Sequence, residues 1–150
     1  MKEYSIVTKS RDETHELGEK LGRSAQPGMV FLMNGDLGAG KTTLTQGIGR
    51  GLGVKKQITS PTFTIMKIYH GRLTLYHIDA YRMEGIDQDL GFDEYLNDDG
   101  LTVIEWSQFM PALIPDEYLS VTITLLDEDQ RQFDMNAAGE RYERLLEELK

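Results

Sequence analysis

The sequence of 150 residues contains no cysteine. Disulfide bonds and thiolate metal sites are therefore excluded, and the composition does not imply an oxidising compartment. The N-terminal stretch MKEYSIVTKSRDE lacks the apolar run of a signal peptide, and no segment approaches the length that spans a membrane. These absences predict a cytoplasmic protein with no membrane association.

Basic residues are also scarce, since 16 Lys and Arg stand against 25 Asp and Glu and give a net charge of −9. An acidic surface repels phosphate backbones, so we do not expect tight direct binding to nucleic acid. A partner protein with a basic face would suit this charge. The alternative is that the charge only keeps the protein soluble.

Apolar patterns along the chain predict alternating strands and helices. Residues 4–9 predict an opening strand, and Ser10 and Glu13 have the capping-box spacing that begins a helix. Two continuous apolar runs, MVFLMN (29–34) and LTVIEW (101–106), are typical of strands buried on both faces. Other patterns predict a hairpin around His70 and Gly71, an acidic helix in residues 87–100, an antiparallel pair joined near DEDQ, and a C-terminal helix from Gly139. The chain is thus expected to form one α/β domain over residues 1–150, with a mixed parallel and antiparallel sheet.

Packing can be predicted for some of these elements. The expected helix at residues 41–53 carries Gly47, Gly49 and Gly51, each costing up to about 1 kcal/mol relative to alanine. Close packing of this helix on the sheet is the expected reason. Alternation and helical spacing place three sets of residues each on one face of its element: Leu119, Val121, Ile123 and Leu125; Phe133, Met135 and Ala137; and Tyr142, Leu145, Leu146 and Leu149.

The stretch from Gly35 to Thr42 reads G-x-x-x-x-G-K-T, the consensus of a phosphate-binding loop. Its glycines permit backbone angles that turn successive N–H groups toward a phosphate, and the N-terminus of the next helix adds positive potential. Lys41 would reach the β and γ phosphates, and the Thr42 hydroxyl would ligate Mg²⁺. An unrelated glycine turn is disfavoured because an apolar strand precedes the loop and a helix follows it. The predicted class is a single-domain P-loop NTPase with helices flanking its mixed sheet.

A phosphate loop also needs an acidic group beside the metal, usually at the end of a buried strand. Asp79 ends LTLYHID and Glu105 ends LTVIE, so either could hold Mg²⁺ while the other orients the attacking water. Both could instead be structural acids that cap loops. His77, Asp79 and Tyr81 recur at spacing two with Arg82 behind, which indicates either a solvated strand face or polar groups at the catalytic end of a strand.

Two further features bear on function. Trp106, the single tryptophan, is expected to be a core or rim aromatic. The hydroxyls of SPTFT (60–64) are suited to sensing a γ-phosphate. No N-K-x-D stretch for reading guanine is present, which favours ATP over GTP. Neither an arginine-rich lid nor a second domain is evident, which disfavours a small-molecule kinase.

Taken together, GDLGAGKTT, SPTFTI, YHIDAYR, LGFDEYL and VIEW, in this order and at these spacings, resemble the bacterial TsaE family, also called the YjeE or YdiB family. The resemblance covers nearly the whole chain. It implies an ATPase of tRNA threonylcarbamoyladenosine (t6A) biosynthesis that binds ATP and Mg²⁺ and works with the proteins TsaD and TsaB. In this picture the ATPase resets the TsaD–TsaB transferase complex between turnovers, and tRNA is contacted only indirectly, through that complex.

The resemblance also implies roles for individual residues. Lys41, Asp79 and Glu105 would be catalytic, with Asp79 positioning water and with Thr42 and Glu105 on Mg²⁺. Thr62 would belong to a switch-like loop and Trp106 to a partner contact. The implied nucleotide contacts are Arg11, Leu37, Gly38, Ala39, Gly40, Lys41, Thr42, Thr43 and Arg131. Ile104 replaces the commoner Val before Glu105, which puts none of these roles in doubt.

Two other functions fit the same residues. A small-molecule P-loop kinase would turn over nucleotide faster when its metabolite is added. A non-hydrolysing ATP-dependent adaptor would bind through Thr42 and Glu105 and show no turnover even with its partners. For the ATPase, we expect slow hydrolysis by the chain alone and faster hydrolysis with TsaD and TsaB.

Overall fold

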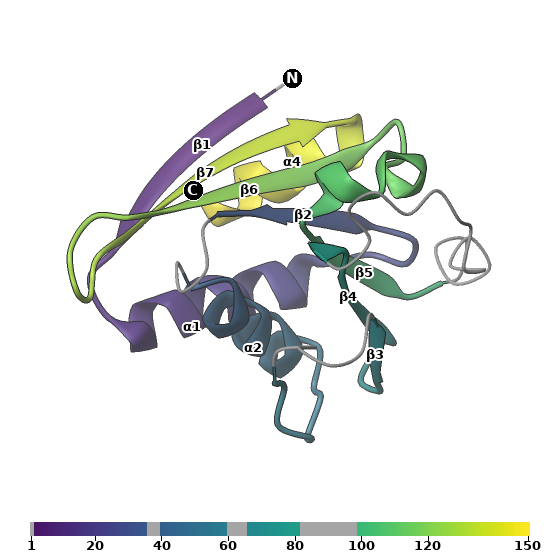
Figure 1. Cartoon of the computed structure of the whole chain (residues 1–150), viewed down its shortest axis with the longest axis horizontal. Coiled ribbons are helices and arrows are strands. Elements are labelled where there is room, and N and C mark those ends of the chain that lie inside the picture. Colours follow the sequence, from purple (N-terminus) through teal and green to yellow (C-terminus); the bar gives the residue numbers. More distant parts are fainter. Residues whose placement is uncertain (1, 36–39, 60–65, 82–98) are drawn as a thin grey trace.

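A computed structural model describes residues 2–35, 40–59, 66–81 and 99–150 (Figure 1). The strands are β1 (Lys2–Thr8), β2 (Val30–Asn34), β3 (Met66–Tyr69), β4 (Leu75–Asp79), β5 (Leu101–Glu105), β6 (Tyr118–Leu125) and β7 (Arg131–Ala138). The helices are α1 (Arg11–Ser24), α2 (Lys41–Gly51) and α4 (Glu140–Leu149), with short 3-10 turns η2 (Ser107–Phe109) and η3 (Pro111–Leu113). These bounds confirm the predicted α/β fold and the predicted order of strands and helices. The acidic helix expected in residues 87–100 falls almost entirely outside the described ranges.

The described strands form one sheet in the order β1-β7-β6-β2-β5-β4-β3. Its centre is parallel, because β2 pairs in parallel with both β6 and β5, and β5 pairs in parallel with β4. Both sides are antiparallel, through the β1–β7, β6–β7 and β3–β4 pairs. The predicted mixed sheet is confirmed. Because the carboxyl ends of parallel strands meet at one edge, β2, β5 and β4 bring their last residues together there, which is where α/β sheets bind ligands.

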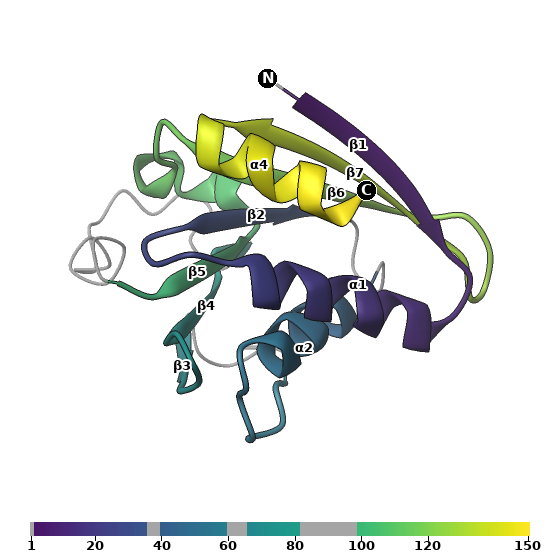
Figure 2. The ribbon, with the colours of Figure 1, turned by 180° about the vertical axis from the view of Figure 1, so that it is seen from behind.

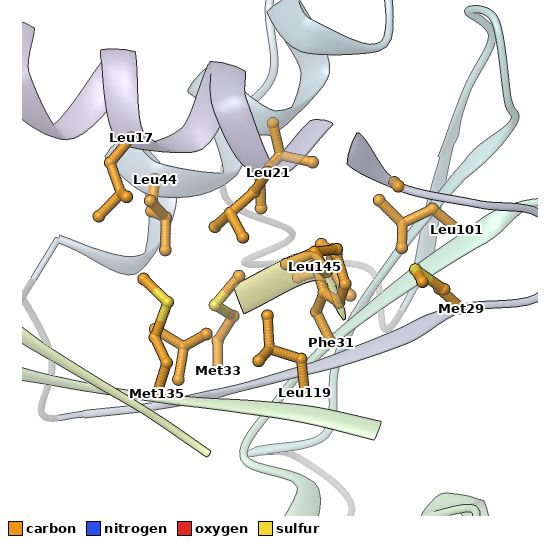
Figure 3. Packing of buried hydrophobic residues seen from close by; sticks show 14 of the residues in the cluster. Leu17, Leu21, Met29, Phe31, Met33, Leu44, Leu101, Leu119, Met135 and Leu145 are labelled. Carbon is orange, nitrogen blue, oxygen red and sulfur yellow. The ribbon is translucent and has the colours of Figure 1, made fainter. Parts of the chain in front are cut away.

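The three helices in the described part of the chain cover the same face of the sheet (Figure 2). Leu17 and Leu21 of α1, Leu44 of α2 and Leu145 of α4 pack with alternate residues of the strands in one buried cluster, as Figure 3 shows. A second, smaller cluster on the other face includes Ile78, Ile104, Met110 and Leu113, from β4, β5 and the η2–η3 segment. Leu75 and Val103 belong to the helix-side cluster, so the residues two positions on, His77 and Glu105, also face the helices.

Glycines of α2 serve a helix–helix contact, so the expected helix–sheet contact was the wrong explanation for them. A Cβ on Gly18 of α1 would lie 2.8 Å from the Gly47 Cα, and a Cβ on Gly51 would lie 2.9 Å from the Gly22 Cα. Real Cβ atoms do not approach other atoms so closely, so these two pairs permit a close crossing of α1 and α2. Gly49 differs, since a Cβ there would meet the Ile58 side chain. The close crossing fixes α2, and therefore Lys41 at its N-terminus, against α1.

Most packing predictions hold. The Ser10 Oγ accepts a hydrogen bond from the Glu13 N–H at 3.1 Å, and the Glu13 carboxylate accepts one from the Lys9 N–H at 2.9 Å, so the cap forms with its return bond shifted to Lys9. Leu125, the last residue of the face predicted for β6, is 54% exposed. The other residues of the three predicted faces are buried, namely Leu119, Val121, Ile123, Phe133, Met135, Ala137, Tyr142, Leu145, Leu146 and Leu149.

Candidate functional site

The two ends of the phosphate-loop consensus are described by the structure. Gly35, directly after β2, has φ 152°, and Gly40, directly before α2, has φ 114°. Residues with a Cβ rarely adopt such positive φ values, so the consensus glycines are needed for their backbone conformation. Leu37, Gly38 and Ala39, predicted to contact nucleotide, lie outside the described residues, as does Thr62 of the expected switch loop.

The helix that follows is suited to an anion. α2 begins at Lys41, its N-cap Gly40 makes no side-chain capping bond, and its first turn contains no acidic residue. The first turn therefore supplies no carboxylate of its own to neutralise the positive end of the helix dipole. Thr42 and Thr43 lie in this first turn and are partly exposed. Such a helix end can hold phosphate through its N–H groups.

Lys41 is buried, with only 6% of its surface exposed. Its Nζ donates a hydrogen bond to the Gly35 carbonyl at 2.9 Å and lies 3.8 Å from the Glu105 Oε1. The same ammonium lies over the Trp106 ring, 4.2 Å from its centre, within cation–π range. The lysine therefore connects the start of the loop to the end of β5.

Glu105 is also buried, at the carboxyl end of β5, and stands opposite Met33 of β2 in the parallel register. Its Oε2 is 2.5 Å from the Nε2 of His77, which is completely buried. The solvated-face interpretation was wrong for His77, which instead forms a buried pair with the strand-end acid. This pairing was missed from the sequence, although the shared spacing of HID and VIE at the ends of two parallel strands was a signal for it.

Asp79 stands directly opposite Glu105 in the β4–β5 register and is half-buried. Burial raises the pKa of the Asp79 carboxyl, and the negative charge of Glu105 adds to this rise. A hydrogen bond from the Tyr81 N–H to Oδ1, at 3.0 Å, and the positive charge of Lys41 oppose it. The carboxylate therefore retains solvent access while lying beside the buried Lys41–Glu105 pair.

Trp106 lies at the rim of this site and is partly exposed. It is the one described non-glycine residue with positive φ, 58°, and this conformation ends β5 and begins η2. Its ring stacks on Phe109, with centroids 6.0 Å apart, and meets the edge of Tyr81 at 5.1 Å. Both interpretations of Trp106 remain compatible with this position, because a rim aromatic can also present a face to a partner.

A separate group of predicted residues gathers around the start of α2. A cavity of about 200 Å³ is lined by Arg11, Gly40, Thr43 and Arg131, together with Glu128 and Asp129 of the β6–β7 turn. Arg131 donates hydrogen bonds from one guanidinium nitrogen to the Asp127 and Glu128 carbonyls at 3.1 and 3.0 Å, which ties it to that turn. Arg11, near the N-terminus of the sequence, and Arg131, near its C-terminus, thus line the same cavity beside the start of α2.

The donor set fits a divalent cation that arrives with phosphate. Among the residues that the structure describes, no group of three or more His, Asp or Glu side chains could hold a metal unaided. Mg²⁺ in phosphate-transfer sites is commonly held by one or two protein oxygens, with phosphate oxygens and water completing the octahedron. The Thr42 hydroxyl and the Glu105 carboxylate would be the two oxygens offered to such an ion.

The fold and the site together define the class of protein to which this chain belongs. The chain is an α/β protein with a mixed sheet, a phosphate-loop consensus between its central strand and the next helix, and an acid at the end of the adjacent parallel strand. None of the described helices is long and apolar enough to cross a membrane.

Comparisons with known proteins agree with this class. The profile of the family described as threonylcarbamoyl adenosine biosynthesis protein TsaE matches residues 8–133. A curated TsaE protein of Bacillus subtilis strain 168 is 43% identical over 150 residues, covering 99% of this chain and 95% of its own. One from Treponema pallidum strain Nichols is 38% identical over 128 residues, covering 84% and 95%. The crystal structure of Bacillus subtilis YdiB superposes with a TM-score of 0.83 at 40% identity, over 99% of this chain and 94% of that one. The chain therefore belongs to the TsaE family, and the predicted resemblance is confirmed.

Proposed function

We propose that this chain binds and hydrolyses ATP with Mg²⁺ as a component of the t6A machinery. The relatives named above are biosynthesis proteins for tRNA threonylcarbamoyladenosine, and the family profile carries the same description. The observation that carries the proposal is that Lys41 contacts both the Gly35 carbonyl, at the start of the loop, and Glu105, at the end of β5. A buried lysine at a helix N-terminus and a buried acid on the next parallel strand are two of the groups that a phosphoryl-transfer site requires.

Binding uses two regions of the site. The N–H groups of the first turn of α2 and the Lys41 ammonium would bind the phosphates. Arg11 and Arg131, which line the adjoining cavity with Gly40 and Thr43, would contact the rest of the nucleotide. Thr42 and Glu105 would hold Mg²⁺, which would neutralise part of the negative charge of the phosphates.

Hydrolysis additionally needs a positioned water. Asp79 is the suitable group, because it adjoins Glu105 in the register and stays half-exposed. Its Oδ1 is held by the Tyr81 N–H, so the carboxylate has a fixed orientation toward solvent. A carboxylate held in this way can accept a hydrogen bond from water and orient it for attack.

The proposed partners are TsaD and TsaB, and the proposed role is to reset their complex between turnovers. In this proposal the energy of hydrolysis would act on the bound complex. The net charge of −9 suits a protein partner better than direct contact with tRNA. In that arrangement tRNA would be held by the complex, and the proposed setting is the cytoplasm.

A pulldown with a purified TsaD–TsaB complex, with and without ATP and Mg²⁺, tests the proposal. We expect nucleotide-dependent capture of the chain and loss of capture with Lys41→Met, which removes the charge and keeps much of the buried volume. Turnover stimulated by a metabolite rather than by the complex would favour a kinase. Binding with no turnover under any condition would favour a non-hydrolysing adaptor.

A further inference from the structure

His77 has no assigned role in binding or hydrolysis, yet its imidazole is completely buried beside the site. We propose that His77 is a positioning residue for the magnesium site, which holds one oxygen of Glu105 so that the other oxygen stays directed at the loop and apart from Lys41. This role rests on the proposed function, because it concerns how Glu105 would meet Mg²⁺ and ATP.

The contact indicates which ring nitrogen of His77 is the donor. A carboxylate oxygen only accepts hydrogen bonds, so the Nε2 that lies 2.5 Å from Glu105 Oε2 must carry the proton. The other ring nitrogen, Nδ1, is buried and has no hydrogen-bond partner in the described structure. A proton on Nδ1 would be a buried donor without an acceptor, which is costly. The geometry therefore fits an imidazole that donates from Nε2 to Glu105.

The sheet register explains why these two side chains meet. His77 stands opposite Val103 in the β4–β5 pair, and Glu105 stands two residues further on, opposite Asp79. Diagonal neighbours on one face of a sheet are within reach of long side chains. Because both strands are locked in the sheet with buried neighbours on each face, the imidazole approaches Glu105 from a fixed direction.

The direction of the hydrogen bond from His77 matters because Glu105 is also attracted to Lys41. The ammonium of Lys41 and the Glu105 Oε1 are both buried but lie 3.8 Å apart, whereas a direct charged hydrogen bond has a length of about 2.7–2.9 Å. Opposite charges in a buried site attract more strongly than in water. Two contacts hold the pair apart: His77 keeps Oε2, and the Gly35 carbonyl accepts from Lys41 at 2.9 Å.

The separation has a functional consequence. If Glu105 were released by His77, we expect its carboxylate to turn toward Lys41 and form a closed ion pair. That pair would compete with Mg²⁺ for the carboxylate and with phosphate for the ammonium. Groups that orient a metal ligand in this way commonly change metal affinity by about 10- to 100-fold when they are replaced.

Two substitutions separate the hydrogen bond from the buried volume. His77→Leu removes the donor, and His77→Gln places an amide N–H the same number of bonds from Cα as the histidine Nε2. The readout is the ratio of ATP affinities with and without Mg²⁺, measured by calorimetry. We expect His77→Leu to reduce this magnesium-dependent gain about tenfold or more, and His77→Gln to restore most of it.

A control variant accounts for simple loss of stability. Tyr142→Phe removes the buried hydroxyl that accepts a hydrogen bond from the Val30 N–H at 2.8 Å, far from the site in the fold. It should destabilise the protein without changing the magnesium-dependent gain. Nitrogen-15 NMR of the ligand-free protein supplies an independent readout, with the His77 proton expected on Nε2 and its signal altered in Glu105→Gln.

The outcomes are distinct. Normal magnesium-dependent gain in both His77 variants, equal effects of the Leu and Gln variants, or a proton on Nδ1 would each overturn the role of His77 while ATP binding stands. Wild-type protein that binds ATP with no gain from Mg²⁺ would overturn it as well. Wild-type protein that binds no ATP would overturn the proposed function itself, and with it this role.

Discussion

The Lys41 ammonium lies over the ring of Trp106, 4.2 Å from its centre. These residues belong to different elements, since Lys41 begins α2 and Trp106 follows the last residue of β5. The positive φ of Trp106 turns the chain so that its ring stands beside the loop rather than continuing the strand. The only tryptophan of the chain therefore contacts the charge that is proposed to bind phosphate.

This contact predicts an optical signal for nucleotide binding. When phosphate binds Lys41, the field at the indole changes, so Trp106 emission should change on addition of ATP or ADP with Mg²⁺. The measurement is a fluorescence titration of the wild-type protein. Lys41→Met should remove the signal, whereas Lys67→Met, which alters an exposed hydrogen bond to Thr59, should keep it. An unchanged spectrum at nucleotide concentrations that calorimetry shows to be saturating would contradict the prediction.

Substitution of the two acids at the strand ends, Glu105 and Asp79, should affect ATP binding and ATP turnover separately. Glu105→Gln should weaken the binding of magnesium-ATP, because it removes the charge that faces the loop. Asp79→Asn should leave binding nearly intact and lower hydrolysis by about 10²-fold, the contribution usually found for a group that handles a proton or orients water. Calorimetry and steady-state phosphate release measure the two effects. The reverse pattern would exchange the assignments.

Asp79 should also affect stability in a pH-dependent way. Its pKa is raised in the folded protein above the ordinary 3.8, chiefly by burial, so the folded state favours the protonated form. The charged carboxylate therefore costs stability at neutral pH, and this cost disappears as the pH falls below the unfolded pKa. Asp79→Asn should raise the melting temperature at pH 7, and the difference from wild type should vanish near pH 3.5. A variant less stable than wild type at pH 7 would contradict this.

The glycine pairs between α1 and α2 should be intolerant of a methyl group. Gly18→Ala and Gly47→Ala each introduce a Cβ into the backbone of the facing helix. Overpacking of this kind costs about 1–3 kcal/mol, although alanine favours helix by itself. For a chain of this length that corresponds to a fall in melting temperature of about 2–4 °C per kcal/mol. Thermal unfolding measures the shift, with Glu16→Ala on the exposed side of α1 as the control.

The features of this fold that depend on residues close together in the chain could be predicted from the sequence. A continuous apolar run such as Val30–Asn34, or the cap at Ser10, is determined by residues close in the chain. The role of the α2 glycines could not be predicted, because the partner helix lies in another segment and glycine patterns do not indicate which neighbour comes close. Alternation also places Leu125 on the same face as Ile123 but does not indicate how far along β6 that face is buried.

The same distinction between nearby and distant parts of the chain applies to the candidate site. Lys41, Thr42 and Glu105 could be proposed as site residues from the sequence because a consensus loop and a strand-end acid are local patterns. The His77–Glu105 pair depends on which strands are neighbours and in what register, namely β4 beside β5 with Asp79 opposite Glu105. Arg11 and Arg131 came only from family resemblance, because the cavity that joins them is formed by both ends of the chain.

Hydrolysis by the chain alone should be slow, and it should accelerate when TsaD and TsaB are present. Phosphoryl transfer needs a loop lysine, a metal, a positioned water and usually one further cation over the γ-phosphate. Lys41, Thr42 with Glu105, and Asp79 are proposed for the first three. For the fourth, Arg131 is held by the carbonyls of the β6–β7 turn, so its guanidinium is already committed in part to protein acceptors.

A cation supplied by a partner can raise turnover by about 10³- to 10⁵-fold, and a partner that only excludes water from the site would give a smaller gain. Steady-state ATP turnover at matched Mg²⁺, with the chain alone and with the TsaD–TsaB pair, measures the effect. Lys41→Met with the same pair is the control for ATPase activity of the partners themselves. Because the chain would act on the complex, we expect the gain to saturate at equimolar complex. Fast turnover by the chain alone, unchanged by the pair, would contradict the resetting role and favour a kinase.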